Sequence, residues 1–228
     1  SSPSQTTPTA SRRRASASVG DELHPLLKGT GFARYIAKIK ASGADSVITG
    51  NWSQDFALLL KASADAGLQV DWYTYYAGGT GGPTSVKQTG LNHRVYEIRE
   101  GSPNKDHAGT KANETAFRDK YKMSILYPRA MNQMRMLAVA VDKAKSTDPI
   151  RIGLALEDMK FEVMNGGEGF MRKDDHQFFQ PMYLVSFGER TAAEPFDEEG
   201  TGWGWRQIAM LDAKDTVIPT TCKMERPK

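Results

Sequence analysis

The chain has 228 residues, of which 39% are hydrophobic and 25% are charged, and its formal net charge is +3. This length is enough to bury a core, either as one large domain or as two small ones. Three arginines, Arg12 to Arg14, stand together in one short segment, so the rest of the chain is close to neutral and shows no nucleic-acid footprint. No apolar stretch approaches the roughly 18 to 20 residues that a membrane-spanning helix needs.

The first 18 residues consist of Ser, Gln, Thr, Pro, Ala and Arg, without periodicity and without any large apolar side chain. Such a segment cannot bury enough surface to offset the entropy of ordering it, so a disordered tail is predicted over residues 1–18. The tail is not a secretory signal, because it has no apolar central region. Residues 19–27 are expected to form a strand that runs into a loop at Pro25.

The next segment, residues 32–76, predicts helix, strand, helix and strand in turn. Apolar residues at helical spacing, closed by Gly43, predict the first helix, and Ser46–Thr49 is a short β-branched strand. A second amphipathic helix ends at Gly67, and residues 70–76 form a strand rich in aromatic side chains. This alternation predicts parallel strands joined by crossover helices in an α/β layer.

The carboxyl ends of these two strands are the predicted ligand site, because α/β sheets bind ligands beyond those ends. Trp52 follows a glycine there, which favours ligand contact over packing, whereas Asn51 is either a ligand hydrogen-bond partner or the cap of the following helix. Tyr75 and Tyr76 end the other strand, and one of this pair is expected to pack into the helix layer. We expect one shared concave face to be lined by Asn51, Trp52, Tyr75 and Tyr76.

The rest of the chain predicts a loop, further helices and then strands. The glycine-rich loop at residues 77–83 lacks the spacing of a phosphate-binding loop, so a strand-to-helix connection is favoured over a nucleotide site. A strand is expected at 94–98, with helices at 112–122, 129–145 and 149–160. Strands are expected within 161–171, 178–188 and 203–211, separated by turns. One face of the helix over 129–145 has a core-like pattern, with Met131, Met134, Leu137 and Val141.

The sequence gives no support for a catalytic, metal or cofactor site. Cys222 is the only cysteine, so it is interpreted as a free thiol, or else as a residue whose disulfide partner lies outside this chain. No Cys/His spacing fits zinc, and the run Asp174-Asp175-His176 is interpreted as a turn. No serine stands in a nucleophile elbow and no paired carboxylates suggest acid–base catalysis, so an enzyme is not expected.

Two parts of this sequence resemble a known family. Residues 36–76 read IAKIKASGADSVITGNWSQDFALLLKASADAGLQVDWYTYY, and the later segments read PRAMNQMRMLAVAVDKAKSTDP, ALEDMKF and MRKDDHQFFQPMY. Together they resemble the type I periplasmic solute-binding proteins that serve ABC importers, in the branched-chain amino acid (Leu/Ile/Val-type) group. The resemblance covers the chain from about residue 19 to the C-terminus.

The resemblance implies a fold and a division into lobes. It implies an α/β protein with a Rossmann-like parallel sheet flanked by helices, present as a second lobe plus a partial first lobe. Residues 19–96 would form the second-lobe core, 97–160 the hinge crossing and first-lobe helices, and 161–228 the return to the second lobe with the C-terminal strands. Proteins of this family are longer, so we expect a truncated or frame-shifted product or a cloning artefact, with the apolar face of the 129–145 helix exposed.

The resemblance also implies a function. Proteins of this kind trap a small solute by hinge closure in the periplasm and deliver it to an ABC permease in the inner membrane. In amino-acid-binding members a carboxylate near the position of Tyr76 holds the ligand's ammonium group, and tyrosine supplies a hydroxyl and a ring but no counter-charge. Amides, short-chain acids and aromatic acids are therefore open beside branched-chain amino acids. The alternatives are a sensor or receptor module of the same fold and, less favoured, a nucleotide-dependent Rossmann-like enzyme.

Overall fold

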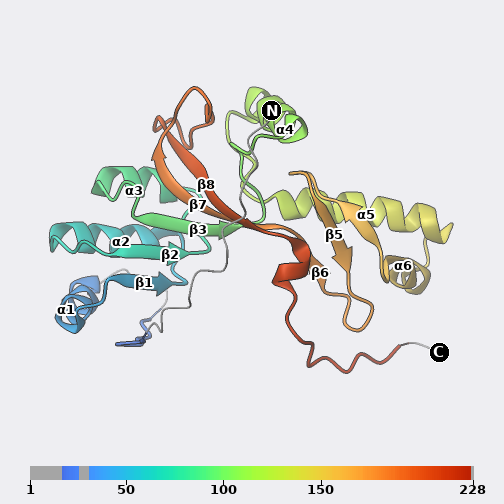
Figure 1. Ribbon diagram of the computed structural model, residues 1–228, viewed down its shortest axis with the longest axis horizontal. Coiled ribbons are helices and arrows are strands. Elements are labelled where there is room, and N and C mark those ends of the chain that lie inside the picture. Colours follow the sequence, from blue (N-terminus) through green and yellow to red (C-terminus); the bar gives the residue numbers. More distant parts are fainter. Residues whose placement is uncertain (1–16, 26–30, 227–228) are drawn as a thin grey trace, which may run out of the picture.

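The computed structural model describes residues 17–25 and 31–226. Its elements gather around two sheets (Figure 1), which define a five-stranded group and a three-stranded group. In chain order the elements are α1 (Phe32–Ser42), β1 (Ser46–Thr49), α2 (Ser53–Asp65), β2 (Asp71–Thr74), α3 (Gly82–Thr89), β3 (Val95–Arg99), α4 (Ala108–Tyr121), α5 (Pro128–Ala144), α6 (Pro149–Leu156), β4 (Lys160–Glu162), β5 (Glu168–Met171), β6 (Phe178–Phe179), β7 (Met182–Glu189), β8 (Trp203–Leu211) and the 3-10 helix η1 (Ala213–Thr216).

The five-stranded group is built on a sheet in the order β1-β2-β3-β7-β8. Strands β1, β2 and β3 are parallel, which confirms the expected α/β alternation, and β7 and β8 add antiparallel partners. The register pairs Thr49 with Thr74, and Thr74 with Glu97. β1 and β2 therefore end level with each other, and β3 continues from Glu97 to Arg99 at the same edge of the sheet.

Helices α1, α2 and α3 cover one face of this sheet. Ile36, Phe56 and Val86 project from the three helices into a core that also contains Trp72 and Tyr183 from the sheet, and all five are fully buried. Burial of apolar side chains of this size is the main force that holds the layers together. The helical spacing of the apolar residues thus set the sheet-facing side of α1 and α2.

The other face of the same sheet is less covered among the described residues. Ile48, Tyr73 and Tyr96 are paired in register on that face, and Ile48 is largely exposed. The rings of Tyr73 and Tyr96 stack with their centroids 5.0 Å apart. Parallel sheets are usually buried on both faces, so this face departs from the common arrangement.

The three-stranded group packs against α5 and α6. Met136 and Ala140 of α5 meet Phe161 of β4, Met171 of β5 and Val163, which follows β4, in a second apolar core. We expected residues 161–228 to return to the second lobe. Strands β4, β5 and β6 form this separate sheet, and the chain rejoins the larger sheet at β7. The reason is physical, because the apolar side chains of the β4–β5 hairpin are buried against α5.

Helix α5 has a second apolar face that points away from this core. Met131, Met134 and Leu137 on that face are exposed, as the resemblance led us to expect, whereas Val141 is partly buried. The buried face of the helix carries Met136 instead. Apolar side chains on two sides are typical of a helix that packs between two layers.

The expectations for the start of the chain are only partly covered by the structure. Residues 1–16 and 26–30 lie outside the described residues, so the expected disordered tail over 1–18 does too, apart from its last two residues. The expected strand at 19–27 is wrong for residues 19–25, which form no helix or strand. A strand needs a neighbour to complete its hydrogen bonds, and no described strand pairs with this segment. His24 instead packs edge-on against Phe32, with 5.0 Å between the ring centroids.

The two groups are joined where the chain leaves β3, where it passes from β6 to β7, and where it leaves β8 (Figure 1). The first crossing is fixed by buried polar contacts. The side-chain amide of Asn104 donates to the carbonyl oxygens of Phe196 (2.9 Å) and Trp205 (3.0 Å). Lys105 Nζ donates to the carbonyl oxygen of Asn165 at 3.0 Å, so adjacent residues of one crossing hold both groups.

Candidate functional site

Two similar turns shape the edge where the parallel strands end. Thr49 Oγ1 accepts a hydrogen bond from the backbone N–H of Asn51, and Thr74 Oγ1 accepts one from the N–H of Tyr76, both at 3.1 Å. Threonine side chains often redirect the backbone in this way. Because Thr49 and Thr74 are paired in register, the turns lie side by side and bring Trp52 and Tyr76 to the same edge.

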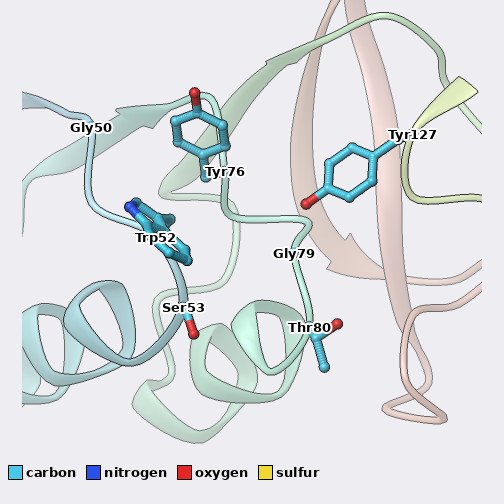
Figure 2. A pocket seen from close by; sticks show the side chains of 7 residues that line it. All are labelled: Gly50, Trp52, Ser53, Tyr76, Gly79, Thr80 and Tyr127. Atoms are coloured by element: carbon cyan, nitrogen blue, oxygen red, sulfur yellow. The ribbon is translucent and has the colours of Figure 1, made fainter. Parts of the chain in front are cut away.

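A pocket of about 620 Å³ opens at this edge, a volume within the usual range of small-molecule sites. Trp52 and Tyr76 approach it from the loops after β1 and β2, and Figure 2 shows Tyr127 across from them, with its hydroxyl directed toward the pocket. No charged side chain belongs to the lining, which consists of Gly50, Trp52, Ser53, Tyr76, Gly79, Thr80 and Tyr127.

The structure brings together two of the four residues expected at the site. Trp52 and Tyr76 line the pocket, whereas Asn51 and Tyr75 do not. The side-chain oxygen of Asn51 lies 2.6 Å from His24 Nε2, and Asn51 does not cap helix α2, because the N-cap position is Trp52. Their contact with a ligand stays a prediction for all four residues.

The expectation that Tyr75 or Tyr76 packs into the helix layer is wrong, because both side chains are exposed. Strand β2 ends at Thr74. The Thr74 hydroxyl accepts a hydrogen bond from the backbone N–H of Tyr76, and this turn carries both tyrosines beyond the sheet. The buried residues of β2 are Trp72 and Thr74. Strand alternation therefore stops two residues earlier than the sequence pattern indicated.

Tyr127 is the aromatic lining residue that sequence reasoning missed, and Gly50, Ser53, Gly79 and Thr80 were not predicted as site residues either. Tyr127 precedes Pro128, which begins α5, and it occupies the N-cap position of that helix. Proline at the first helical position is a strong start signal, so the Tyr-Pro pair indicated a side chain just outside a helix. It did not indicate which strand edge that side chain would face, because Tyr127 lies about 50 residues beyond Tyr76 in the chain.

The glycine-rich loop acts as a connection, and its donors are already occupied. Glu199, from the loop between β7 and β8, accepts hydrogen bonds from the N–H groups of Gly81 (2.5 Å) and Thr84 (3.0 Å). These are donors that a phosphate at the start of α3 would need. A side chain at Gly82 would come within 2.0 Å of the Ala77 carbonyl oxygen, so the glycine is required by close backbone packing.

Two buried ionisable side chains, Glu97 and Arg99, lie near Gly78 in the loop that leads to the pocket. A Cβ atom on Gly78 would stand 2.8 Å from Glu97 Oε2 and 3.1 Å from Arg99 Nη1, so this glycine lets the loop close over both groups. Burial raises the pKa of the Glu97 carboxyl to about 7, although Arg99 and a hydrogen bond from the Gly78 backbone act in the opposite direction. Neither charge belongs to the pocket lining.

Over residues 17–25 and 31–226, no helix is long and apolar enough to cross a membrane. In the same ranges no three His, Cys, Asp or Glu side chains are grouped so that they could hold a metal ion. Cys222 is exposed and carries a free thiol.

Comparison with known proteins defines the class of this chain. The family model of periplasmic binding proteins matches residues 3–192, so the chain belongs to the periplasmic binding protein family. This confirms the resemblance and the type I fold class. The match begins earlier than residue 19, so it includes most of the segment that we expected to lie outside the family pattern.

Its relatives include Leu/Ile/Val-binding protein homolog 4 of Brucella abortus (strain 2308), which is 28% identical over 221 residues. That alignment covers 92% of this chain and 51% of the relative. The leucine-, isoleucine-, valine-, threonine- and alanine-binding protein of Pseudomonas aeruginosa is 26% identical over 156 residues, covering 65% of this chain and 40% of that protein. The chain thus spans about half the length, or less, of these curated relatives.

Solved structures agree on the fold. The leucine-, isoleucine-, valine-, threonine- and alanine-binding protein of Brucella ovis, in a closed conformation, superposes with a TM-score of 0.80 at 25% identity, covering 90% of this chain and 53% of that one. A solute-binding protein of an ABC transporter from Rhodopseudomonas palustris HaA2, solved with p-hydroxybenzoic acid, gives a TM-score of 0.63 at 19% identity, covering 80% and 49%. The second likeness shows the fold alone.

Proposed function

We propose that this chain supplies one face of the ligand cleft in the substrate-binding component of an ABC importer. The observation that carries the proposal is the pocket at the carboxyl ends of β1 and β2. Trp52 and Tyr76 line it from the loops after these strands, and Tyr127, directly before α5, lies across from them. The chain belongs to the periplasmic binding protein family, and relatives such as the Brucella protein are named for binding Leu, Ile and Val.

In this proposal the five-stranded group is the second lobe and the three-stranded group with α5 and α6 is part of the first. Two of the connections, from β6 to β7 and from β8 to η1, are short, which suits a hinge, and closure would press Tyr127 toward Trp52. Binding is the whole activity, without chemical conversion of the solute. A permease in the inner membrane would recognise the closed form in the periplasm.

The ligands to consider are branched-chain amino acids and related small solutes, namely amides, short-chain acids and aromatic acids. The names of similar proteins support both ends of this range, since they include Leu/Ile/Val-binding proteins and a protein solved with p-hydroxybenzoic acid. Trp52 offers the largest contact area on the pocket wall, and aromatic side chains dominate the energetics of such surfaces.

Calorimetric titration of the chain with representatives of these four ligand classes tests the proposal. With any solute that binds, Trp52→Ala should weaken binding by about 1 to 3 kcal/mol, the scale of a lost aromatic contact. Tyr76→Phe should cost roughly 0.5 to 1.5 kcal/mol if its hydroxyl bonds the ligand. Tyr75→Ala is the matched control, because Tyr75 is exposed outside the pocket and should leave affinity unchanged. Equal affinity of Trp52→Ala and the parent would show that the site is misplaced.

A further inference from the structure

We propose that the pocket takes the ring of a small aromatic carboxylate, and this proposal rests on the proposed function in solute binding. The first argument is the form of the walls. Trp52, Tyr76 and Tyr127 are 46%, 43% and 46% exposed, and all three residues line the same pocket. Figure 2 shows Trp52 and Tyr76 on one side and Tyr127 on the other, which suits a flat group between them.

A flat ring uses these walls better than a branched aliphatic chain. Aromatic pairs gain from stacked and edge-to-face contacts in addition to the area they bury, whereas an aliphatic group gains from the area alone. The lining also includes Ser53 and Thr80, and the side chains of these two residues and of the two tyrosines carry hydroxyl groups. Hydroxyl groups donate to a carboxylate without contributing a charge of their own.

The charges near the pocket disfavour an ammonium group on the ligand. The lining contains no carboxylate, and Glu97, which lies behind Gly78, is buried beside Arg99. An ammonium taken from water without a counter-ion is costly to bury. A cation of the protein already lies against one of these rings, since the Arg129 guanidinium is 4.6 Å from the centre of the Tyr127 ring and is itself paired with Glu100. The ammonium group of an amino acid therefore finds no carboxylate in the pocket lining. An aromatic acid has no ammonium group and so does not need one.

Four solutes test separately whether the pocket prefers an aromatic ring and whether it disfavours an ammonium group. Benzoate has a ring and no ammonium, cyclohexanecarboxylate lacks the aromatic ring, phenylalanine adds the ammonium, and leucine has the ammonium without the ring. The 228-residue chain, labelled with 5-fluorotryptophan, reports binding by fluorine NMR, because only one of its four tryptophans, Trp52, lines the pocket. The Trp52→Phe variant identifies the resonance of Trp52.

We expect benzoate to shift the Trp52 resonance saturably and to bind about tenfold more tightly than each of the other three solutes. Trp52→Leu should lower the benzoate affinity about tenfold, whereas Trp203→Leu, on β8 outside the pocket, should not. Equal binding of cyclohexanecarboxylate would overturn ring recognition, and tighter binding of phenylalanine or leucine would overturn the aromatic-acid class while leaving solute binding intact. If none of the four solutes shifts the Trp52 resonance, the proposed function fails at this site together with the ligand class.

Discussion

The buried carboxyl of Glu97 gives this fold a testable dependence on pH. Glu97 belongs to a buried cluster of three glutamates and two arginines, together with Arg99, Glu114, Arg118 and Glu198. Arg118 pairs with Glu114 at 3.1 Å and with Glu198 at 3.5 Å. With every member ionised the cluster carries one net negative charge, which is expensive away from water. Burial raises the pKa of all three carboxyl groups, that of Glu97 to about 7.

The sign of the effect follows from the direction of this change. The folded protein holds a proton on Glu97 at pH values where the unfolded chain, with an ordinary pKa of 4.5, has released it. The contribution of Glu97 to the free energy of unfolding is therefore highest below about pH 4.5, and it falls as the pH rises toward 7. One pKa unit corresponds to about 1.4 kcal/mol, so a rise from 4.5 to about 7 makes ionised Glu97 cost about 3 kcal/mol.

Glu97→Gln keeps the shape and removes the charge, which leaves two glutamates opposite two arginines. We expect the variant to be about 1 to 3 kcal/mol more stable than the parent at pH 8, and close to it or slightly less stable at pH 5. Urea unfolding followed by circular dichroism at both pH values measures this difference. Glu168→Gln is the control, because Glu168 pairs with Lys160 at the exposed surface and should change stability by less than about 0.5 kcal/mol. A Glu97→Gln variant that is less stable than the parent at pH 8 would refute the reasoning, since it would show that Arg99 fully compensates the ionised carboxylate.

Two further predictions concern packing and helix capping. On α5, Met134 is 68% exposed and Met136 is 5% exposed, so Met134→Lys should change the free energy of unfolding by less than about 0.5 kcal/mol, whereas Met136→Lys should cost about 3 kcal/mol or more. Urea titration of the pair decides this, and similar losses for both would mean that the outer face is covered in solution. Glu199→Ala should lower the free energy of unfolding by about 1 kcal/mol, because it removes the acceptor for the N–H groups of Gly81 and Thr84 at the start of α3. Glu199→Gln keeps an acceptor oxygen and should therefore lose less stability. Thermal unfolding that is identical for Glu199→Ala and the parent would contradict this capping role.

The regular part of the fold could be predicted from local pattern alone. Apolar spacing set the helices α1 and α2, and β-branched or aromatic runs set β1 and β2, within one or two residues at most ends. The partner of each later strand was not encoded locally. The sequence pattern predicted strands in the segments of β4 to β6 just as in those of β7 and β8. Packing against Met136 and Ala140 places β4 to β6 in another sheet.

The site was half predictable for a similar reason. Trp52 and Tyr76 follow from the rule that ligands bind beyond the carboxyl ends of parallel strands, and both line the pocket. The rule does not reach details such as the Thr74 turn, which exposes Tyr75 without bringing it into the lining. It also cannot supply Tyr127, which reaches the pocket only because the chain crosses between two groups of elements.

The exposed apolar surfaces and the open pocket have a common explanation in how these elements are packed. The sheet that carries Ile48 is covered by helices on one face, and the helix that carries Met134 is covered by strands on one side. Both elements have the two-sided apolar pattern of interior layers, in a chain that spans about half the length of relatives such as the Brucella protein. Polypeptide packed against these faces would lie against the same elements that present Trp52 and Tyr127. It would bury apolar surface and narrow the pocket together, so the proposed affinity for a solute would depend on what covers these faces.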